Sequence, residues 1–228
     1  MILTDKYIKD PINTLPIPLW KHNVTAIRQD MMYVLDANYN ETLYRDFQDT
    51  LYLRLQHNLL DLKLGKLPAH YFLSSYKESD GALIYNLIKE CYGSNVEYDR
   101  VDHLVKDETF NDLLCVFLYN DKVFNLENMI NLRKNNLGKE RNYKPIGMVI
   151  AQFDQKTKEA SIEYLCVSEK FRNKGLGSLL LQEILLRISN IADFATVSFE
   201  KNNNEHLEKM FRKYGFEGNA IWHMLRKQ

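Results

Sequence analysis

Residues 162–178 read IEYLCVSEKFRNKGLGS, and the rest of the chain is best interpreted from this stretch. An apolar run gives way to a polar segment, which leads into two alternating glycines, Gly175 and Gly177. Such glycines let the backbone turn sharply and bring its N–H groups close to an anion. Arg172 and Lys174 add positive charge, and the apolar residues that follow predict a helix whose N-terminus favours negative charge. We therefore predict a pyrophosphate-binding loop between a strand and a helix.

Two other phosphate-binding motifs do not fit these letters. A Rossmann fingerprint needs a third glycine where this chain has Leu180. A Walker A loop needs a lysine before its serine or threonine, and the pair Gly177-Ser178 lacks it. For the glycines taken alone, a tight turn that ends a strand is the structural alternative.

The pattern Arg-x-x-Gly-x-Gly after a strand resembles the GNAT superfamily of N-acetyltransferases. Three groups of residues carry the resemblance: Ile162 to Val167, Arg172 to Gly177, and the downstream Asn204, Phe211 and Tyr214-Gly215-Phe216. It is strongest over residues 145–216 and extends back to about Val24. The resemblance implies a mixed α/β fold in which helices flank a central, mostly antiparallel sheet.

The resemblance also implies acetyl-CoA as the co-substrate and no metal. In the family, the strand before the loop diverges from the next strand, and the pantetheine arm pairs with its exposed backbone groups. The residues assigned in this way to the coenzyme are Leu165, Cys166, Val167, Arg172, Asn173, Lys174, Gly175, Leu176, Gly177, Ser178 and Asn204. The segment from arginine to serine matches the pyrophosphate loop, and Asn204 matches an asparagine near the pantetheine arm.

The reaction implied is direct attack of a primary amine, on a small molecule or a peptide, on the thioester in a ternary complex. A backbone N–H near Val167 would hold the developing oxyanion, and a base must deprotonate the amine. Glu163 is the candidate base, because it is a charged residue among apolar neighbours on the same strand. Its alternatives are a glutamate that faces solvent or one that is held in an ion pair.

The general acid departs from the family pattern. Many members carry a tyrosine where this chain has Phe211, and Tyr214 faces another direction on the predicted helix. Water, or no acid at all, is acceptable because a thiolate is a tolerable leaving group. The phenylalanine also supports an alternative function, a non-catalytic acyl-CoA-binding sensor or regulatory module.

Composition narrows the class of protein. The 228 residues include 30 basic and 30 acidic ones, so no net charge favours nucleic acid or a membrane surface. Cys91, Cys115 and Cys166 are far apart and form no metal-binding motif, which is typical of a reducing compartment. No apolar run approaches the roughly 20 residues of a membrane span. We expect a cytoplasmic protein whose partners are acetyl-CoA and an amine, without nucleic acid or membrane, and with a homodimer as an option.

The domain organisation is predicted as an arm followed by one domain. Residues 1–23 contain three of the five prolines and predict an irregular arm. Residues 24–228 form a single GNAT domain, with a coenzyme-binding core at about 109–228 and an insertion at 121–144. The final strand leaves a sheet edge that we expect the arm or a second subunit to complete.

Hydrophobic periodicity predicts the individual elements. Leu43, Phe47, Leu51, Leu55 and Leu59 recur at a spacing of four and predict a helix over 41–62. The other predicted helices are 80–91, 177–191 and 204–214, with a helical turn at 124–132. The predicted strands are 24–35, 113–119, 146–153, 160–168, 195–199 and 221–225.

Overall fold

The computed structural model describes residues 2–24, 31–93, 98–121, 144–202 and 204–227. Its strands are β1 (Met31–Leu35), β2 (Phe47–His57), β3 (Tyr71–Ser75), β4 (Phe110–Asn120), β5 (Gly147–Asp154), β6 (Glu159–Val167), β7 (Phe194–Glu200) and β8 (Glu217–Lys227). They form one sheet in the order β1-β8-β2-β7-β6-β5-β4-β3. Strands β6 and β7 run parallel, whereas β1–β8, β2–β7, β2–β8, β3–β4 and β4–β5 are antiparallel pairs. The predicted mixed, mostly antiparallel α/β sheet is confirmed.

The helices of the described residues are α1 (Ile2–Lys9), α2 (Pro11–Thr14), α3 (Leu19–Val24), α4 (Glu41–Tyr44), α5 (Gly81–Tyr92), α6 (Tyr98–Lys106), α8 (Leu176–Ile188) and α9 (Glu205–Lys213). Short 3₁₀ turns occupy Asp36–Asn38, Glu78–Asp80 and Glu169–Phe171. None of these helices has the length and apolar character needed to cross a membrane. The predicted insertion lies largely, and the helical turn at 124–132 entirely, outside the described residues.

The predicted irregular conformation of residues 1–23 is wrong, because α1, α2 and most of α3 lie there. The prolines punctuate these short helices instead of preventing them. Asp10 accepts a hydrogen bond from the N–H of Asn13 at 3.4 Å and caps α2. Pro11 follows in the first helical turn, where a missing N–H costs little.

The predicted helix over residues 41–62 is also wrong beyond its first turn. Only Glu41–Tyr44 is helical, and Phe47–His57 is strand β2. A spacing of four is a multiple of the strand period of two, so the leucine stripe fits one face of a strand equally well. Pairing with β7 on one side and β8 on the other decides the outcome.

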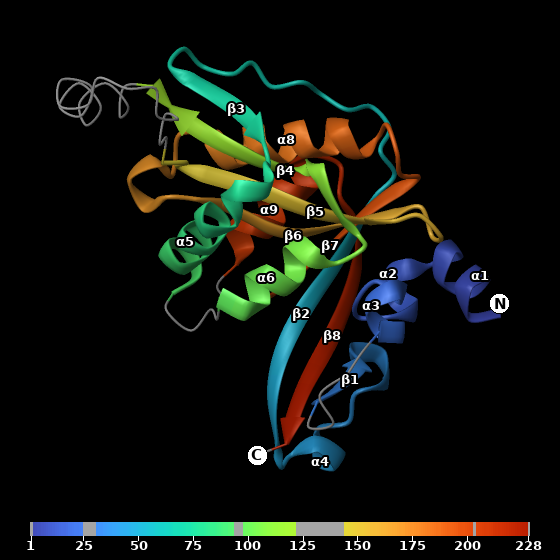
Figure 1. Ribbon diagram of the computed structural model, residues 1–228. Helices are drawn as coiled ribbons and strands as arrows, with labels where there is room; N and C mark the ends of the chain where they lie inside the picture. The colour runs from blue at the N-terminus through green and yellow to red at the C-terminus, as the bar shows by residue number, and fades with distance from the viewer. Residues whose placement is uncertain (1, 25–30, 94–97, 122–143, 203, 228) are drawn as a thin grey trace. The chain divides into compact units, whose positions relative to one another are not determined.

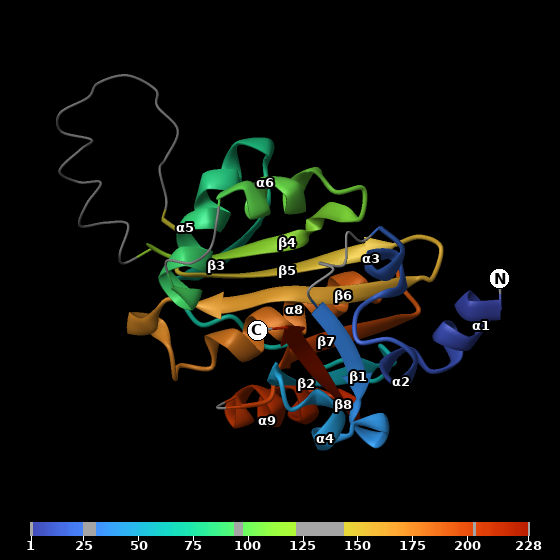
Figure 2. The ribbon, with the colours of Figure 1, turned by 90° about the horizontal axis from the view of Figure 1, so that it is seen from below.

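The chain divides into two compact units, and the first holds residues 1–62, 153–163 and 188–228. Strands β7 and β8 are consecutive in the chain, yet β2 from the N-terminal part lies between them. Figure 1 shows β2 and β8 side by side, and Figure 2 shows β1 along β8. The expectation that the arm or a second subunit completes the edge beside the last strand is therefore wrong. The residues after the arm supply both neighbours of β8.

A buried polar cluster lies within this first unit. Arg54 of β2 places Nη2 3.0 Å from Oε1 of Glu159, and both side chains are fully buried. The hydroxyl of Tyr7 donates to Oε2 of Glu159 at 2.6 Å, and the hydroxyl of Thr196 donates to Oε1 at 2.5 Å. Burial raises the pKa of the Glu159 carboxyl, while Arg54 and the two hydroxyls act in the opposite direction. This cluster joins α1, β2, β6 and β7.

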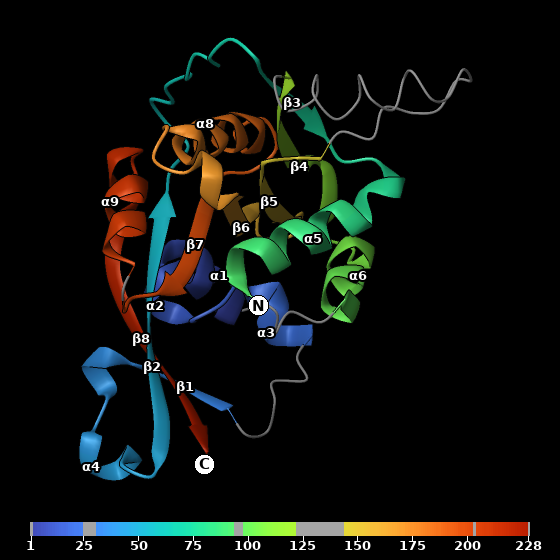
Figure 3. The same cartoon turned by 90° about the vertical axis from the view of Figure 1, so that its left-hand side faces the viewer.

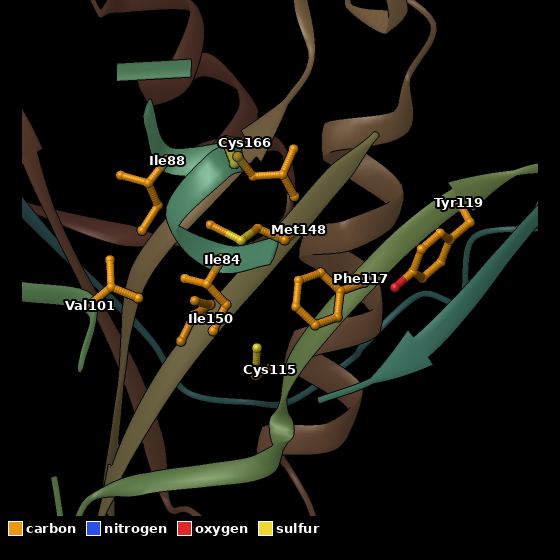
Figure 4. Packing of buried hydrophobic residues seen from close by; sticks show 10 residues of the cluster. Ile84, Ile88, Val101, Cys115, Phe117, Tyr119, Met148, Ile150 and Cys166 are labelled. Carbon is orange, nitrogen blue, oxygen red and sulfur yellow. The ribbon is translucent and has the colours of Figure 1, made fainter. Parts of the chain in front are cut away.

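The second unit holds residues 63–152 and 164–187. In it α5 and α6 cover one face of the strands and α8 covers the other (Figure 3). Alternate residues of β4 and β5 pack with α5 in a buried cluster (Figure 4). The cluster consists of Ile84, Leu87, Ile88, Val101, Cys115, Phe117, Tyr119, Met148, Ile150 and Cys166.

Candidate active site

The parallel ladder between β6 and β7 is short. It begins with Glu159 opposite Phe194 and its last pair is Ile162 opposite Val197. Strand β6 itself continues to Val167. The backbone of β6 beyond Ile162 therefore lies outside this ladder, which is the arrangement that the pairing of a pantetheine arm requires.

The loop after β6 turns in two left-handed steps. Asn173 has φ 61° and Gly175 has φ 75°, on either side of Lys174. The carbonyl of Gly175 accepts from the N–H of Leu179 at 3.1 Å, so α8 begins directly after this glycine. The first N–H groups of a helix lack partners within it and point beyond its N-terminus. The loop and helix start thus fit an anionic pyrophosphate group.

Position 175 requires glycine because of its backbone conformation, and not because neighbouring atoms leave no room for a side chain. A Cβ atom there would meet no atom within 4 Å, yet φ lies in the region that L side chains rarely adopt. At position 173 the chain has asparagine, which is among the residues other than glycine that best tolerate this conformation.

The cationic side chains of the loop are exposed and held by local contacts. Nε of Arg172 donates to the carbonyl of Val167 at 3.0 Å, which ties the loop to the end of β6. Nζ of Lys174 lies 5.1 Å from the ring centre of Phe171. The second unit therefore gathers the predicted residues Leu165, Cys166, Val167 and Arg172 to Ser178 on one strand–loop–helix segment.

Two further residues support this segment and were missed by sequence reasoning. A Cβ on Gly147 would lie 3.0 Å from the carbonyl oxygen of Cys166 and 3.3 Å from Leu180, so glycine lets β5 approach β6 and α8 closely. A glycine at the start of an apolar strand was the available signal. The hydroxyl of Tyr92, at the end of α5, donates to the carbonyl of Leu165 at 3.1 Å. This contact spans 73 positions in the chain and has no local signal.

Glu163, the candidate base, lies on β6 immediately after the last residue of the parallel ladder. Its Oε2 is 2.5 Å from Nζ of Lys21 in α3, and both side chains retain some exposure. The ion pair that the sequence left open as an alternative is therefore present. This ion pair competes with any role of Glu163 as the acceptor of a proton from an amine.

The residues predicted on and around α9 belong to the first unit. Asn204 precedes α9, and its Nδ2 donates to the carbonyl of Glu200 at 2.8 Å. Phe211 is 3% exposed, stacks on Phe199 at 5.6 Å and meets Phe216 edge-on at 5.1 Å. Phe211 is therefore a core residue, and it carries no group that could protonate a thiolate.

Comparisons with known proteins concern the family and the fold of the chain. The model of the acetyltransferase (GNAT) family matches residues 82–216, more than half of the chain. The fold resembles a GCN5-related N-acetyltransferase from Sphaerobacter thermophilus, with a TM-score of 0.64 and 14% identity over 86% of this chain and 58% of that one. A GNAT acetyltransferase from Colwellia psychrerythraea gives a TM-score of 0.53 and 14% identity over 86% of this chain and 64% of that one.

A functionally unknown conserved protein from Staphylococcus epidermidis has the same fold, with a TM-score of 0.58 and 13% identity over 87% of this chain and 73% of that one. At such identities the likeness shows a shared fold alone. The chain spans less than two thirds of the Sphaerobacter and Colwellia proteins. No curated protein matches the sequence.

Proposed function

The chain belongs to the acetyltransferase (GNAT) family, and on this premise we propose that it transfers the acetyl group of acetyl-CoA to a primary amine. The acceptor would be a small molecule or a peptide, and transfer would be direct within a ternary complex. The observation that carries the proposal is the left-handed pair Asn173 and Gly175 at the start of α8. This loop offers backbone donors and a helix N-terminus to a pyrophosphate.

The proposal gives each segment a task. Residues Arg172 to Ser178 bind the pyrophosphate, and backbone groups of Leu165, Cys166 and Val167 bind the pantetheine arm. Asn204 contributes a further contact to that arm. Acetyl-CoA supplies an activated acyl group, so the chain itself needs to orient the amine, move one proton and stabilise charge. The residue set calls for no metal.

Glu163 is proposed as the base, with Lys21 as its partner in the free protein. An incoming ammonium group carries the same charge as Lys21 and would replace it beside the carboxylate. The ammonium would then pass one proton to Glu163, and the neutral amine that results would attack the thioester. This exchange makes Glu163 a specific target for mutation.

Two measurements test the proposal. Saturating acetyl-CoA should raise the melting temperature by mass action; no shift with any acyl-CoA would refute coenzyme binding. Release of free thiol from acetyl-CoA should then depend on an amine drawn from a panel of small amines, polyamines and peptides. Turnover should fall steeply in Glu163→Gln, and unchanged turnover would remove Glu163 as the base. Tight binding without turnover on any acceptor would favour the acyl-CoA sensor, which the buried Phe211 also fits.

A further inference from the structure

Two cysteines that are far apart in the chain, Cys91 and Cys166, take part in the packing around the buried cluster of the second unit. Cys91 lies in the last turn of α5, one turn after Ile88, and Figure 4 shows Ile88 and Cys166 at the same end of the buried cluster. Cys91 packs against the buried cluster that contains Cys166, and each of the two thiols shifts the pKa of the other. The next residue, Tyr92, bonds to the carbonyl of Leu165 at 3.1 Å, so the helix end is held against the strand.

The two thiols have different environments. Cys91 is half-buried, whereas Cys166 is 6% exposed. The hydrogen bond from Cys166, with the hydrogen bond and charge of Arg172, lowers the pKa of Cys91 to about 7 against the opposing effects of partial burial and Glu90. The carboxylate of Glu90 is itself 3.4 Å from Nζ of Lys144. The same contact and burial raise the pKa of the Cys166 thiol well above its usual value.

We propose that Cys91 and Cys166 form an oxidation site, at which hydrogen peroxide or an organic hydroperoxide converts the thiol pair to a disulfide. The Cys91 thiolate attacks one peroxide oxygen, the O–O bond breaks, and Cys91 becomes a sulfenic acid while the other oxygen leaves as water or alcohol. The Cys166 sulfur then attacks the Cys91 sulfur and loses its proton. The S–S bond forms, and the sulfenic oxygen leaves as water. The two thiols lose two electrons and the peroxide gains them.

This site is coupled to the coenzyme through Arg172, a step that rests on the proposed function. In the free protein Arg172 lowers the pKa of the Cys91 thiol and donates from Nε to the carbonyl of Val167. A bound pyrophosphate competes for that guanidinium and adds negative charge beside the thiolate. Coenzyme binding therefore favours the neutral thiol of Cys91 and slows its oxidation, and the coupling is reciprocal.

The first test maps the oxidised sulfurs. Reduced protein is exposed to hydrogen peroxide at pH 7, quenched with an alkylating agent, digested and analysed by mass spectrometry. We expect a cross-linked Cys91–Cys166 peptide. Cys115 is the internal control, because it is 0% exposed and lies at the other end of the cluster (Figure 4). Equal oxidation of Cys115, or oxidised Cys91 beside a free Cys166, overturns the proposal.

Single variants assign the roles of the two thiols. In Cys166→Ser, Cys91 should stop at the sulfenic acid, which a cyclic 1,3-dione captures. In Cys91→Ser, Cys166 should stay reduced and the dione adduct should disappear. Oxidation of Cys166 at its usual rate in that variant refutes Cys91 as the reactive thiol. Cys166→Ala repeats the first variant with an apolar side chain in case serine disturbs the buried cluster.

The coupling is tested with desulfo-coenzyme A, which carries the pyrophosphate but no thiol to react with peroxide. A saturating amount should slow the loss of the Cys91 thiol about fivefold or more, the lower end of typical coupling strengths. Binding itself is measured separately, from the melting temperature of the reduced protein. A melting shift without protection refutes the coupling. No shift refutes the proposed function, while the Cys91–Cys166 cross-link decides the oxidation site by itself.

Discussion

The loop at Arg172 to Ser178 and the cluster around Arg54 and Glu159 use charge in opposite ways. In the loop the cationic side chains are exposed, and residues with a left-handed backbone conformation determine the turn of the chain. The cluster encloses one cation and one anion completely, and α1 and β7 supply the hydroxyl groups that bond to them. Exposed cations on a loop of fixed backbone conformation suit a ligand that binds and dissociates. Fully buried charges stabilise the fold only while each of their partners is present. Substitutions in the two regions should therefore affect different measurements.

The largest effect on stability is expected for Arg54→Met. Removing the guanidinium leaves Glu159 buried with only the hydroxyls of Tyr7 and Thr196, and breaking a buried pair from one side costs about 3–5 kcal/mol. Denaturant unfolding measures this loss. Without Arg54 the pKa of Glu159 rises further in the folded state. The native variant then binds more protons than the unfolded chain, so its stability falls as pH rises above the pKa of glutamate in the unfolded chain, about 4.3.

The control for this substitution removes both charges. Arg54→Met combined with Glu159→Met replaces the pair by apolar side chains of similar length and should recover most of the lost stability. A single variant within about 1 kcal/mol of the unchanged protein would show that the pair contributes little. Coenzyme affinity, measured under conditions where the variants are folded, should stay unchanged.

The loop should show the reverse pattern in Gly175→Val. A side chain at φ 75° strains the backbone by about 1–2 kcal/mol. The larger consequence is that the backbone N–H groups of the loop no longer converge on the pyrophosphate. Acetyl-CoA affinity should therefore fall more than about hundredfold, which is about 2.7 kcal/mol of binding free energy. Isothermal titration calorimetry measures the affinity, and thermal melting confirms that the variant is folded.

Gly93→Val is the matched control for the loop substitution. Gly93 has φ 96° and, like Gly175, would place a Cβ atom with no neighbour within 4 Å. The backbone strain is therefore comparable, while the position lies at the end of α5. We expect similar destabilisation with affinity largely preserved. Equal loss of affinity in both variants would attribute the Gly175 effect to general destabilisation.

The same two regions show what could be predicted from the sequence. The loop is a local feature, because its glycines, its cations and the following helix are adjacent in the chain. The cluster is not local: Tyr7 and Glu159 are separated by 152 positions, and nothing near either residue identifies the other. The ion pair of Glu163 with Lys21 also joins residues that are distant in the chain, so the local sequence does not predict it.

Strand β2 illustrates a second limit, the ambiguity of a pattern. Leu51 and Leu55 satisfy both a helical stripe and a strand face, and only the neighbours β7 and β8 separate these readings. By contrast, α5, α8 and α9 have apolar positions at mixed spacings of three and four, which no strand shares. These helices were predicted correctly in type and nearly in extent.

A smaller effect on binding is expected for Arg172→Gln. Glutamine keeps a polar side chain but removes the charge, and a charge-assisted hydrogen bond contributes about 1.5–3 kcal/mol. Acetyl-CoA affinity should fall by at least about tenfold, and it should depend less on salt. Lys170→Gln removes a neighbouring exposed cation that has no assigned role and should have little effect. Equal losses in both variants would indicate a general electrostatic effect and not a specific contact.

The smallest effect is expected for Asn204→Ala, and it separates two roles of one side chain. Loss of the hydrogen bond from Nδ2 to the carbonyl of Glu200 should cost about 1 kcal/mol of stability. If Asn204 also contacts the pantetheine arm, acetyl-CoA affinity falls by a similar free energy, about fivefold. Asn204→Asp is the companion variant, because aspartate is a favourable residue before a helix but lacks the amide donor. Unchanged affinity in both variants would remove Asn204 from the coenzyme site and leave it the structural role of bonding to the carbonyl of Glu200.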